Sequence, residues 1–186
     1  MGQESKTDQQ YSQIVAMCRD VFQKKMQDYG SAWRILRPSS LTDQIYIKAQ
    51  RIRSLQRKGT QKILEGITPE FIGIVNYAII GLIQLELGPS DVIDLDRQEA
   101  TNHYNDYFEQ ARKLMHNKNH DYGEAWRDMR VSSLADIILM KLLRIKQIED
   151  NEGQAVYSEG IDANYYDIIN YAVFALIKLE LEADRK

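Results

Sequence analysis

The sequence lacks several features that would assign the chain to a familiar class. It has one cysteine, Cys18, so no intrachain disulfide can form, and we expect a protein of the reducing cytoplasm. Its polar N-terminus has no apolar core typical of a signal peptide. The longest apolar runs, near 71–87 and 165–181, contain Asn, Tyr and Glu. We therefore expect two buried helices and no membrane span.

Charge and known motifs exclude further classes. The net charge is −3, which argues against a broad binding surface for duplex nucleic acid. No zinc site, P-loop, nucleophile elbow or GxGxxG loop is present. No segment alternates apolar and polar residues with a period of two for long enough to predict a sheet. The composition, 44% hydrophobic and 27% charged, is that of an ordinary globular domain.

What the sequence does contain is an internal duplication. The block DYGSAWRILRPSSLTDQIYIKAQRIRSLQ begins at Asp28 and recurs 93 residues later, at Asp121, with about half of its positions unchanged. A second block, EGITPEFIGIVNYAIIGLIQLEL, begins at Glu65 and recurs 94 residues later, at Glu159. Repeats of this kind indicate one structural unit that is used twice.

Helical periodicity and turn residues divide each copy into three helices. In the first copy we expect helices over about 11–27, 40–56 and 68–87, and in the second over about 98–118, 133–149 and 162–182. Gly30 and Gly123 should end the first helix of each copy. The predicted fold is all-α, with two tandem three-helix repeats packed as a pseudo-twofold helical bundle that can dimerise further.

The predicted organisation follows from these elements. Residues 1–9 should be disordered, 10–88 form the first repeat, 89–97 the linker and 98–186 the second repeat. Ser40 with Asp43, and Ser133 with Asp136, have the spacing of a capping box. Thr68, followed by Pro69, and its counterpart Asp162 are predicted helix N-caps. Trp33 and Trp126 are expected to anchor the core.

Several polar residues that a core does not need are present in both copies. These pairs are Asp28/Asp121, Tyr29/Tyr122, Arg34/Arg127, Arg37/Arg130, Lys48/Lys141, Arg51/Arg144, Glu65/Glu159 and Asn76/Asn170.

Two of these sets are candidates for ligand binding. Lys48 and Arg51, like Lys141 and Arg144, lie three residues apart on one helix face, where they suit a phosphate group or are simply solvated. Asn170 lies in a very apolar helix, so it is either a hydrogen-bond pin between helices or a group that faces a ligand. Tyr122 is a further candidate to face the ligand.

The copies differ mainly in acidic residues. Asp167 stands where the first copy has Gly73, and an apolar helix rejects a carboxylate that has no partner. Glu159, Asp162 and Asp167 are therefore candidate ligands for Mg²⁺, which prefers a few carboxylates together with water and phosphate oxygens. Glu159, Asp167 and Asp121 are the catalytic candidates; Asp121 follows His120, which is either part of a general base or an ordinary surface histidine.

The motifs K-x-x-D-Y-G-x-x-W from Lys118, D-x-x-x-x-K-x-x-R-I from Asp136 and E-G-x-x-x-x-x-x-D-x-x-N-Y-A from Glu159 resemble a known family. This family is the first of the nucleotide-modification-associated domains, and the resemblance covers nearly all of residues 11–182. It implies a role in modified-nucleotide metabolism. A more distant likeness is to the all-α nucleoside triphosphate pyrophosphatases, although their E-x-x-E motif is missing here.

These observations lead to two main functional hypotheses. One is a Mg²⁺-dependent enzyme that cleaves a phosphoanhydride bond of a nucleotide, with Lys141 and Arg144 neutralising phosphate. The other is a non-catalytic module that binds a nucleotide or a protein. A purely structural helical dimer is the third possibility, but a scaffold has no need for Asp167.

Overall fold

The computed structural model describes residues 5–59, 61–152 and 160–183, and it describes residues 61–65 by their backbone alone. The described residues are almost entirely helical and contain no strand, so the all-α prediction is confirmed. The helices are α1 (Lys6–Tyr29), α2 (Pro38–Lys58), α3 (Gln61–Leu87), α4 (Arg97–Tyr122), α5 (Val131–Asp150) and α6 (Ile161–Leu176). Short 3₁₀ turns η1 (Ala32–Ile35) and η2 (Ala125–Asp128) follow α1 and α4, and a π-helical turn, η3 (Ile177–Leu181), follows α6.

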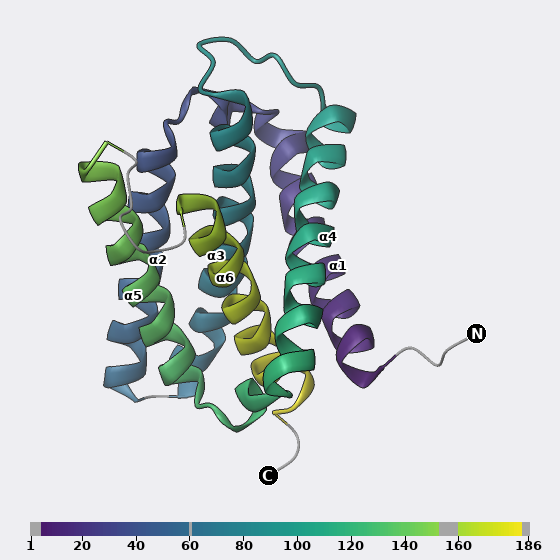
Figure 1. Ribbon diagram of the computed structural model, residues 1–186, viewed down its shortest axis with the longest axis vertical. Coiled ribbons are helices and arrows are strands. Elements are labelled where there is room, and N and C mark those ends of the chain that lie inside the picture. Colours follow the sequence, from purple (N-terminus) through teal and green to yellow (C-terminus); the bar gives the residue numbers. More distant parts are fainter. Residues whose placement is uncertain (1–4, 60, 153–159, 184–186) are drawn as a thin grey trace.

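Corresponding helices of the two repeats lie side by side. Figure 1 shows α2 with α5 at one side of the molecule, α3 with α6 in the middle, and α1 with α4 at the other side. The apolar helices α3 and α6 thus have neighbours on both sides, which explains why they have few polar positions. The two repeats therefore share one hydrophobic core, as the sequence predicted for a pseudo-twofold bundle.

The predicted capping boxes are wrong. The helices α2 and α5 begin two residues before Ser40 and Ser133, and their N-caps are Arg37 and Arg130, which make no side-chain capping bond. Pro38 occupies the first turn of α2. There its fixed φ suits the helix and its missing N–H costs nothing.

The aspartates of those motifs link the repeats instead. Asp43 pairs with Lys146 at 3.0 Å, and Asp136 pairs with Arg53 at 3.8 Å. The two pairs are equivalent, because Arg53 and Lys146 are counterparts in the duplication. Both cross the α2–α5 contact, so the retained aspartates help to set the register between two helices of different repeats.

The N-cap predicted at Thr68 is also wrong, because α3 begins at Gln61 and Pro69 lies inside the helix. The expected disorder of residues 1–9 is wrong for 6–9, which form the first turn of α1. Ser5 caps this turn by accepting a hydrogen bond from the Asp8 N–H. For α6 the N-cap is Gly160 rather than Asp162. Helix ends thus depend on tertiary contacts as much as on local sequence.

Two glycines end helices as predicted. Gly30 follows α1 with φ +59°, and Gly123 follows α4 with φ +65°. Side-chain-bearing residues rarely adopt such φ values, so these turns favour glycine.

One helix has the length and composition of a membrane span. It is the segment Gly66–Leu87 of α3, so the sequence run near 71–87 is less interrupted than we expected. In the structure, 72% of its most apolar window is buried. The burial of α3 against α2 and α6 accounts for its hydropathy.

The arginines retained at Arg34 and Arg127 are structural. Buried Arg34 donates to the Gly88 carbonyl at 2.7 Å and pairs with Asp94 at 2.8 Å, which fixes η1 to the linker. Arg127 pairs with Glu182 at 2.7 Å, so it holds η2 against the end of the second repeat. Both arginines use their several donors to join segments that have no regular backbone pairing.

The two retained asparagines join the repeats through buried tyrosines. The hydroxyl of Tyr104, in α4, donates to Asn76 Oδ1 at 2.7 Å, and that of Tyr11, in α1, donates to Asn170 Oδ1 at 2.8 Å. Each bond therefore runs from the first helix of one repeat to the last helix of the other. Burial raises the pKa of both phenols far above the ordinary value, so the hydroxyls stay protonated and keep donating.

We predict that Tyr11→Phe and Tyr104→Phe each lower the free energy of unfolding by about 1–3 kcal/mol, because each leaves a buried asparagine oxygen without its donor. Urea denaturation followed by circular dichroism measures this. The control is Tyr166→Phe, whose hydroxyl bonds Gln110 at an exposed position and whose loss should cost less than about 0.5 kcal/mol. Equal losses in all three variants would contradict the role of the buried pairs.

A second polar contact between the repeats surrounds the hydroxyl of Thr42. This hydroxyl lies 2.6 Å from Glu149 Oε1 and 2.6 Å from the Tyr165 hydroxyl. Burial raises the pKa of the Glu149 carboxyl above its ordinary value. The protonated Glu149 carboxyl therefore makes its full contribution to the free energy of unfolding below the pKa of the unfolded chain, about 4.3. That contribution declines as the pH rises through the higher pKa of the folded state, because the buried carboxyl then becomes charged.

We therefore predict that Glu149→Gln, which introduces the residue that the first repeat has at this position, raises the melting temperature at pH 7–8. The gain should shrink as the pH falls and vanish below about pH 4.3, where the wild-type carboxyl is protonated in both states. Thermal melts between pH 3.5 and 8 test this. A difference independent of pH would contradict it.

Candidate functional site

Each repeat contains a cleft built from residues that are equivalent in the two copies. The first has a volume of about 360 Å³ and the second about 440 Å³, both large enough for a small ligand. All twelve residues that line the first cleft have counterparts in the lining of the second, which has Lys141 in addition. The first cleft is lined by Phe22, Lys25, Met26, Tyr29, Gly30, Ala32, Trp33, Leu36, Gly73, Asn76, Tyr77 and Ile80. The duplication has therefore preserved a cavity as well as a fold.

The second cleft contains a buried carboxylate held by two lysines. Asp167, on α6, is 7% exposed. Its Oδ2 accepts from Lys141 Nζ, on α5, at 2.8 Å, and its Oδ1 accepts from Lys118 Nζ, on α4, through a short contact. The charged set thus comes from three helices and combines two positive charges with one negative charge. This pairing explains how an apolar helix tolerates an aspartate.

The first cleft has no such carboxylate. Gly73 occupies the position of Asp167, and the side chain of Lys48 lies across it. A Cβ added to Gly73 would be only 2.7 Å from Lys48 Cε. The Lys48 ammonium group is 3.4 Å from Glu70, which also accepts from Arg51 at 3.0 Å. The predicted phosphate-binding pair of the first repeat therefore already has a carboxylate partner.

The two asparagines line their clefts but are pins between helices. Besides the bond from Tyr11, Asn170 donates from Nδ2 to the Ala111 carbonyl at 2.9 Å. Asn76 makes the equivalent bond to the Cys18 carbonyl at 3.1 Å. Both the oxygen and the amide nitrogen of each side chain are thus used inside the protein. Of the two alternatives for Asn170, the geometry favours the pin.

The remaining predicted residues lie around the second cleft or outside it. Tyr122 lines its mouth and is 78% exposed. Asp121 is exposed and contacts only the neighbouring His120, at 3.3 Å, among the described residues. Arg144 lies one turn from Lys141, is half-buried and forms no ion pair with the described part of the chain. Asp162 is exposed near the start of α6, and Glu159 lies outside the described residues.

The described residues do not fit a Mg²⁺ ion. No group of three His, Cys, Asp or Glu side chains in the described ranges comes close enough to hold a metal. Both oxygens of Asp167 already bond lysine ammonium groups, whose charge repels a cation.

Lys118 is a residue of the site that the sequence reasoning missed, although it opens the quoted motif. The sequence contained a signal for Lys118, because Lys25 has the same place in the first copy.

Trp126 is buried, as expected of a core anchor, and stacks on Phe174 with ring centroids 4.3 Å apart. Its indole Nε1 has no hydrogen-bond partner in the described structure, which is uncommon for a buried donor. Trp33 Nε1, by contrast, donates to a methionine sulfur.

The architecture and its clefts define a class: an all-α protein made of two tandem repeats, each with a ligand-sized cleft built from equivalent residues. The chain belongs to the nucleotide modification associated domain 1 family, whose model matches residues 25–85 and 118–179. The two matched segments fall in the two repeats, which confirms the resemblance and the duplication. No curated protein and no solved structure matches the chain.

We predict that Asp167→Asn lowers the free energy of unfolding by about 1–3 kcal/mol. Without the carboxylate, the largely buried Lys141 and the half-exposed Lys118 lose the negative charge between them. Chemical denaturation measures the loss. The matched control is Asp20→Asn, which breaks an exposed pair with Lys24 and should cost less than about 0.5 kcal/mol. A loss no larger than the control's would show that the Asp167 pairs do not hold the helices together.

Proposed function

We propose that the chain binds a nucleotide in its second cleft. The observation that supports this most directly is the convergence of Lys118 and Lys141 on one side of a cleft whose other residues are mainly apolar and aromatic. In this proposal the two ammonium groups bind phosphate, and the base lies against the apolar side. The family's association with nucleotide modification supports the same class of ligand.

The charge of the cluster suits an anion. Among the residues that the structure describes, the cluster contains two ammonium groups and one carboxylate. An ammonium group has three N–H donors, and Asp167 accepts one of them from Lys141. Lys141 can therefore bond a phosphate oxygen while it keeps Asp167. The carboxylate orients both lysines before a ligand arrives, which lowers the entropy cost of binding.

The walls of the cleft suit a base. Met115 and Met129 provide apolar surface, and Tyr171 lies beside Phe174, with ring centroids 6.3 Å apart. The exposed ring of Tyr122 is placed at the mouth, where it can stack on a planar ligand. In this proposal Tyr122 has the ligand-facing role predicted from the sequence.

Binding is a better proposal than hydrolysis for these residues. A general base needs an oxygen that can accept a proton from a water or substrate, and both Asp167 oxygens already accept from lysines. Asp121 lies outside the lining of the cleft. The hydrolase prediction relied on Glu159 and Asp162 joining Asp167, and Asp162 is exposed near the helix start.

The test is isothermal titration of the whole protein with ribo- and deoxyribonucleoside mono-, di- and triphosphates, with and without Mg²⁺. We expect binding by at least one, and a dissociation constant at least about tenfold higher for Lys141→Met, because a charge-assisted phosphate contact is lost. Lys24→Met, which removes an exposed lysine on α1, is the control and should bind like the wild type.

Two results would overturn this proposal. One is the absence of heat with every nucleotide at millimolar concentration. The other is an equal loss of affinity in Lys141→Met and Lys24→Met. Mg²⁺-dependent release of phosphate or pyrophosphate from the same panel would replace binding by hydrolysis.

A further inference from the structure

We infer that the first cleft is a second binding site, for a nucleoside monophosphate or a similar aromatic ligand with one phosphate group. The inference rests on the proposed function, since it takes the ligand class from it. It goes further by assigning a separate site with its own selectivity, based on the differences between the two clefts.

The first difference is the charge of the lining. Lys25 is the only charged residue among the twelve that line the first cleft, and none of the twelve is acidic. Lys25 is exposed and forms no ion pair with the residues that the structure describes. In the second cleft, by contrast, the corresponding lysine, Lys118, bonds the carboxylate of Asp167. A ligand phosphate at the first cleft therefore meets an ammonium group without an acidic competitor.

The second difference is the position of Gly73. With no side chain at Gly73, the methylenes of Lys48 cover the place where Asp167 stands in the other cleft. The Lys48 ammonium group lies 3.4 Å from Glu70 and 5.7 Å from the ring centre of Tyr77, and its Nζ is 3.1 Å from the place that a Gly73 Cβ would take. This part of the first cleft therefore holds one lysine that is paired with Glu70, whereas its counterpart in the second holds an aspartate between two lysines.

These two differences limit the ligand. Phe22, Met26 and Ile80 are almost fully buried side chains that line the cleft, and the ring of Trp33 adds aromatic surface. A volume of about 360 Å³ is at the small end of ligand pockets, which suits one base and sugar. One unpaired lysine matches one phosphate better than a longer chain of phosphates, whose further charges would have no partner among the lining residues.

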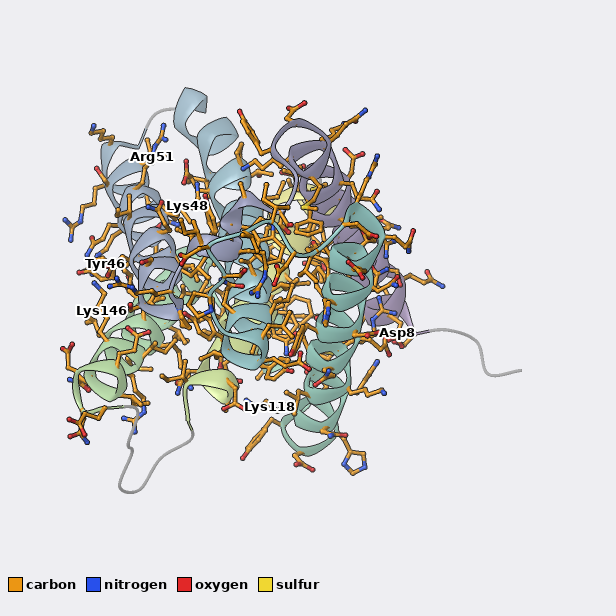
Figure 2. The ribbon with its side chains drawn as sticks, turned by 90° about the horizontal axis from the view of Figure 1, so that it is seen from above. Asp8, Tyr46, Lys48, Arg51, Lys118 and Lys146 are labelled. Carbon is orange, nitrogen blue, oxygen red and sulfur yellow. The ribbon has the colours of Figure 1, made fainter. Side chains whose placement is uncertain are left out.

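The two sites are separate in space. Lys48, beside the first cleft, and Lys118, in the second, lie well apart in Figure 2, and the two clefts share no lining residue. Each cleft also contains one of the only two tryptophans of the chain, Trp33 in the first and Trp126 in the second. The indole N–H signals of the unaltered protein therefore report on the two clefts independently.

The experiment is a titration of ¹⁵N-labelled full-length protein, followed by the two indole signals in ¹H–¹⁵N correlation spectra. A Trp33→Phe sample assigns the signals. The probes are the four deoxyribonucleoside monophosphates and the corresponding uncharged nucleosides. We expect a monophosphate to shift the Trp33 signal in a saturable way, with weaker binding of its nucleoside.

The matched variants are Lys25→Met and Lys24→Met, which remove adjacent lysines of α1. Lys25→Met should raise the dissociation constant measured at Trp33 about three- to tenfold, because it removes the phosphate contact. It should leave Trp126 shifts unchanged, and Lys24→Met should affect neither signal. Circular dichroism of both variants checks that the fold is intact.

The outcomes separate this inference from the proposed function. Shifts of Trp126 alone would support nucleotide binding in the second cleft and overturn the site in the first. Shifts of Trp33 alone would support the site in the first cleft and overturn nucleotide binding in the second. A Trp33 response that is equal for nucleosides and monophosphates, or that is unaffected by Lys25→Met, would overturn the assignment of a phosphate contact.

Discussion

The exchange of hydrogen bonds between Tyr11 and Asn170, and between Tyr104 and Asn76, is the constraint on which the rest of the structure depends. Each asparagine receives its tyrosine from the other repeat and donates to a backbone carbonyl of its own repeat. Four buried polar side chains can be satisfied at once only when α1 and α4 lie in one register against α3 and α6. That register places the lysine-bearing ends of α1 and α4 at the clefts.

Within this shared frame, two positions make the clefts chemically different: Gly73 corresponds to Asp167, and Glu70 corresponds to Asn164. The aspartate of α6 binds two lysines, whereas the glycine of α3 leaves Lys48 to turn toward Glu70. Two differences on one helix thus change the partners of several charged side chains without changing the helices that support them. The tandem arrangement permits this, because a mutation affects one cleft only, whereas in a homodimer it would change both.

The sequence predicted the helices, the duplication and the shared bundle because these depend on periodicity and on repeated blocks. It failed at Ser40, Asp43 and Thr68, because α2 and α3 begin before Ser40 and Thr68, and Asp43 pairs with Lys146 of the other repeat. For the site, an aspartate in an apolar helix was a sound signal for Asp167. Sequence spacing could not show that its partners would be lysines from two other helices rather than carboxylates, because that depends on how distant helices approach.

Each repeat contains one tyrosine and one asparagine of the kind that form these bonds. Tyr11 and Asn76 belong to the first repeat, and Tyr104 and Asn170 belong to the second. Two identical copies of one such unit could therefore make the same two bonds with each other. The present chain has the geometry of that dimer with its subunits fused by the linker of residues 88–96. Gene fusion of this kind removes the dependence of assembly on protein concentration, because the second subunit is always present at a fixed, high local concentration.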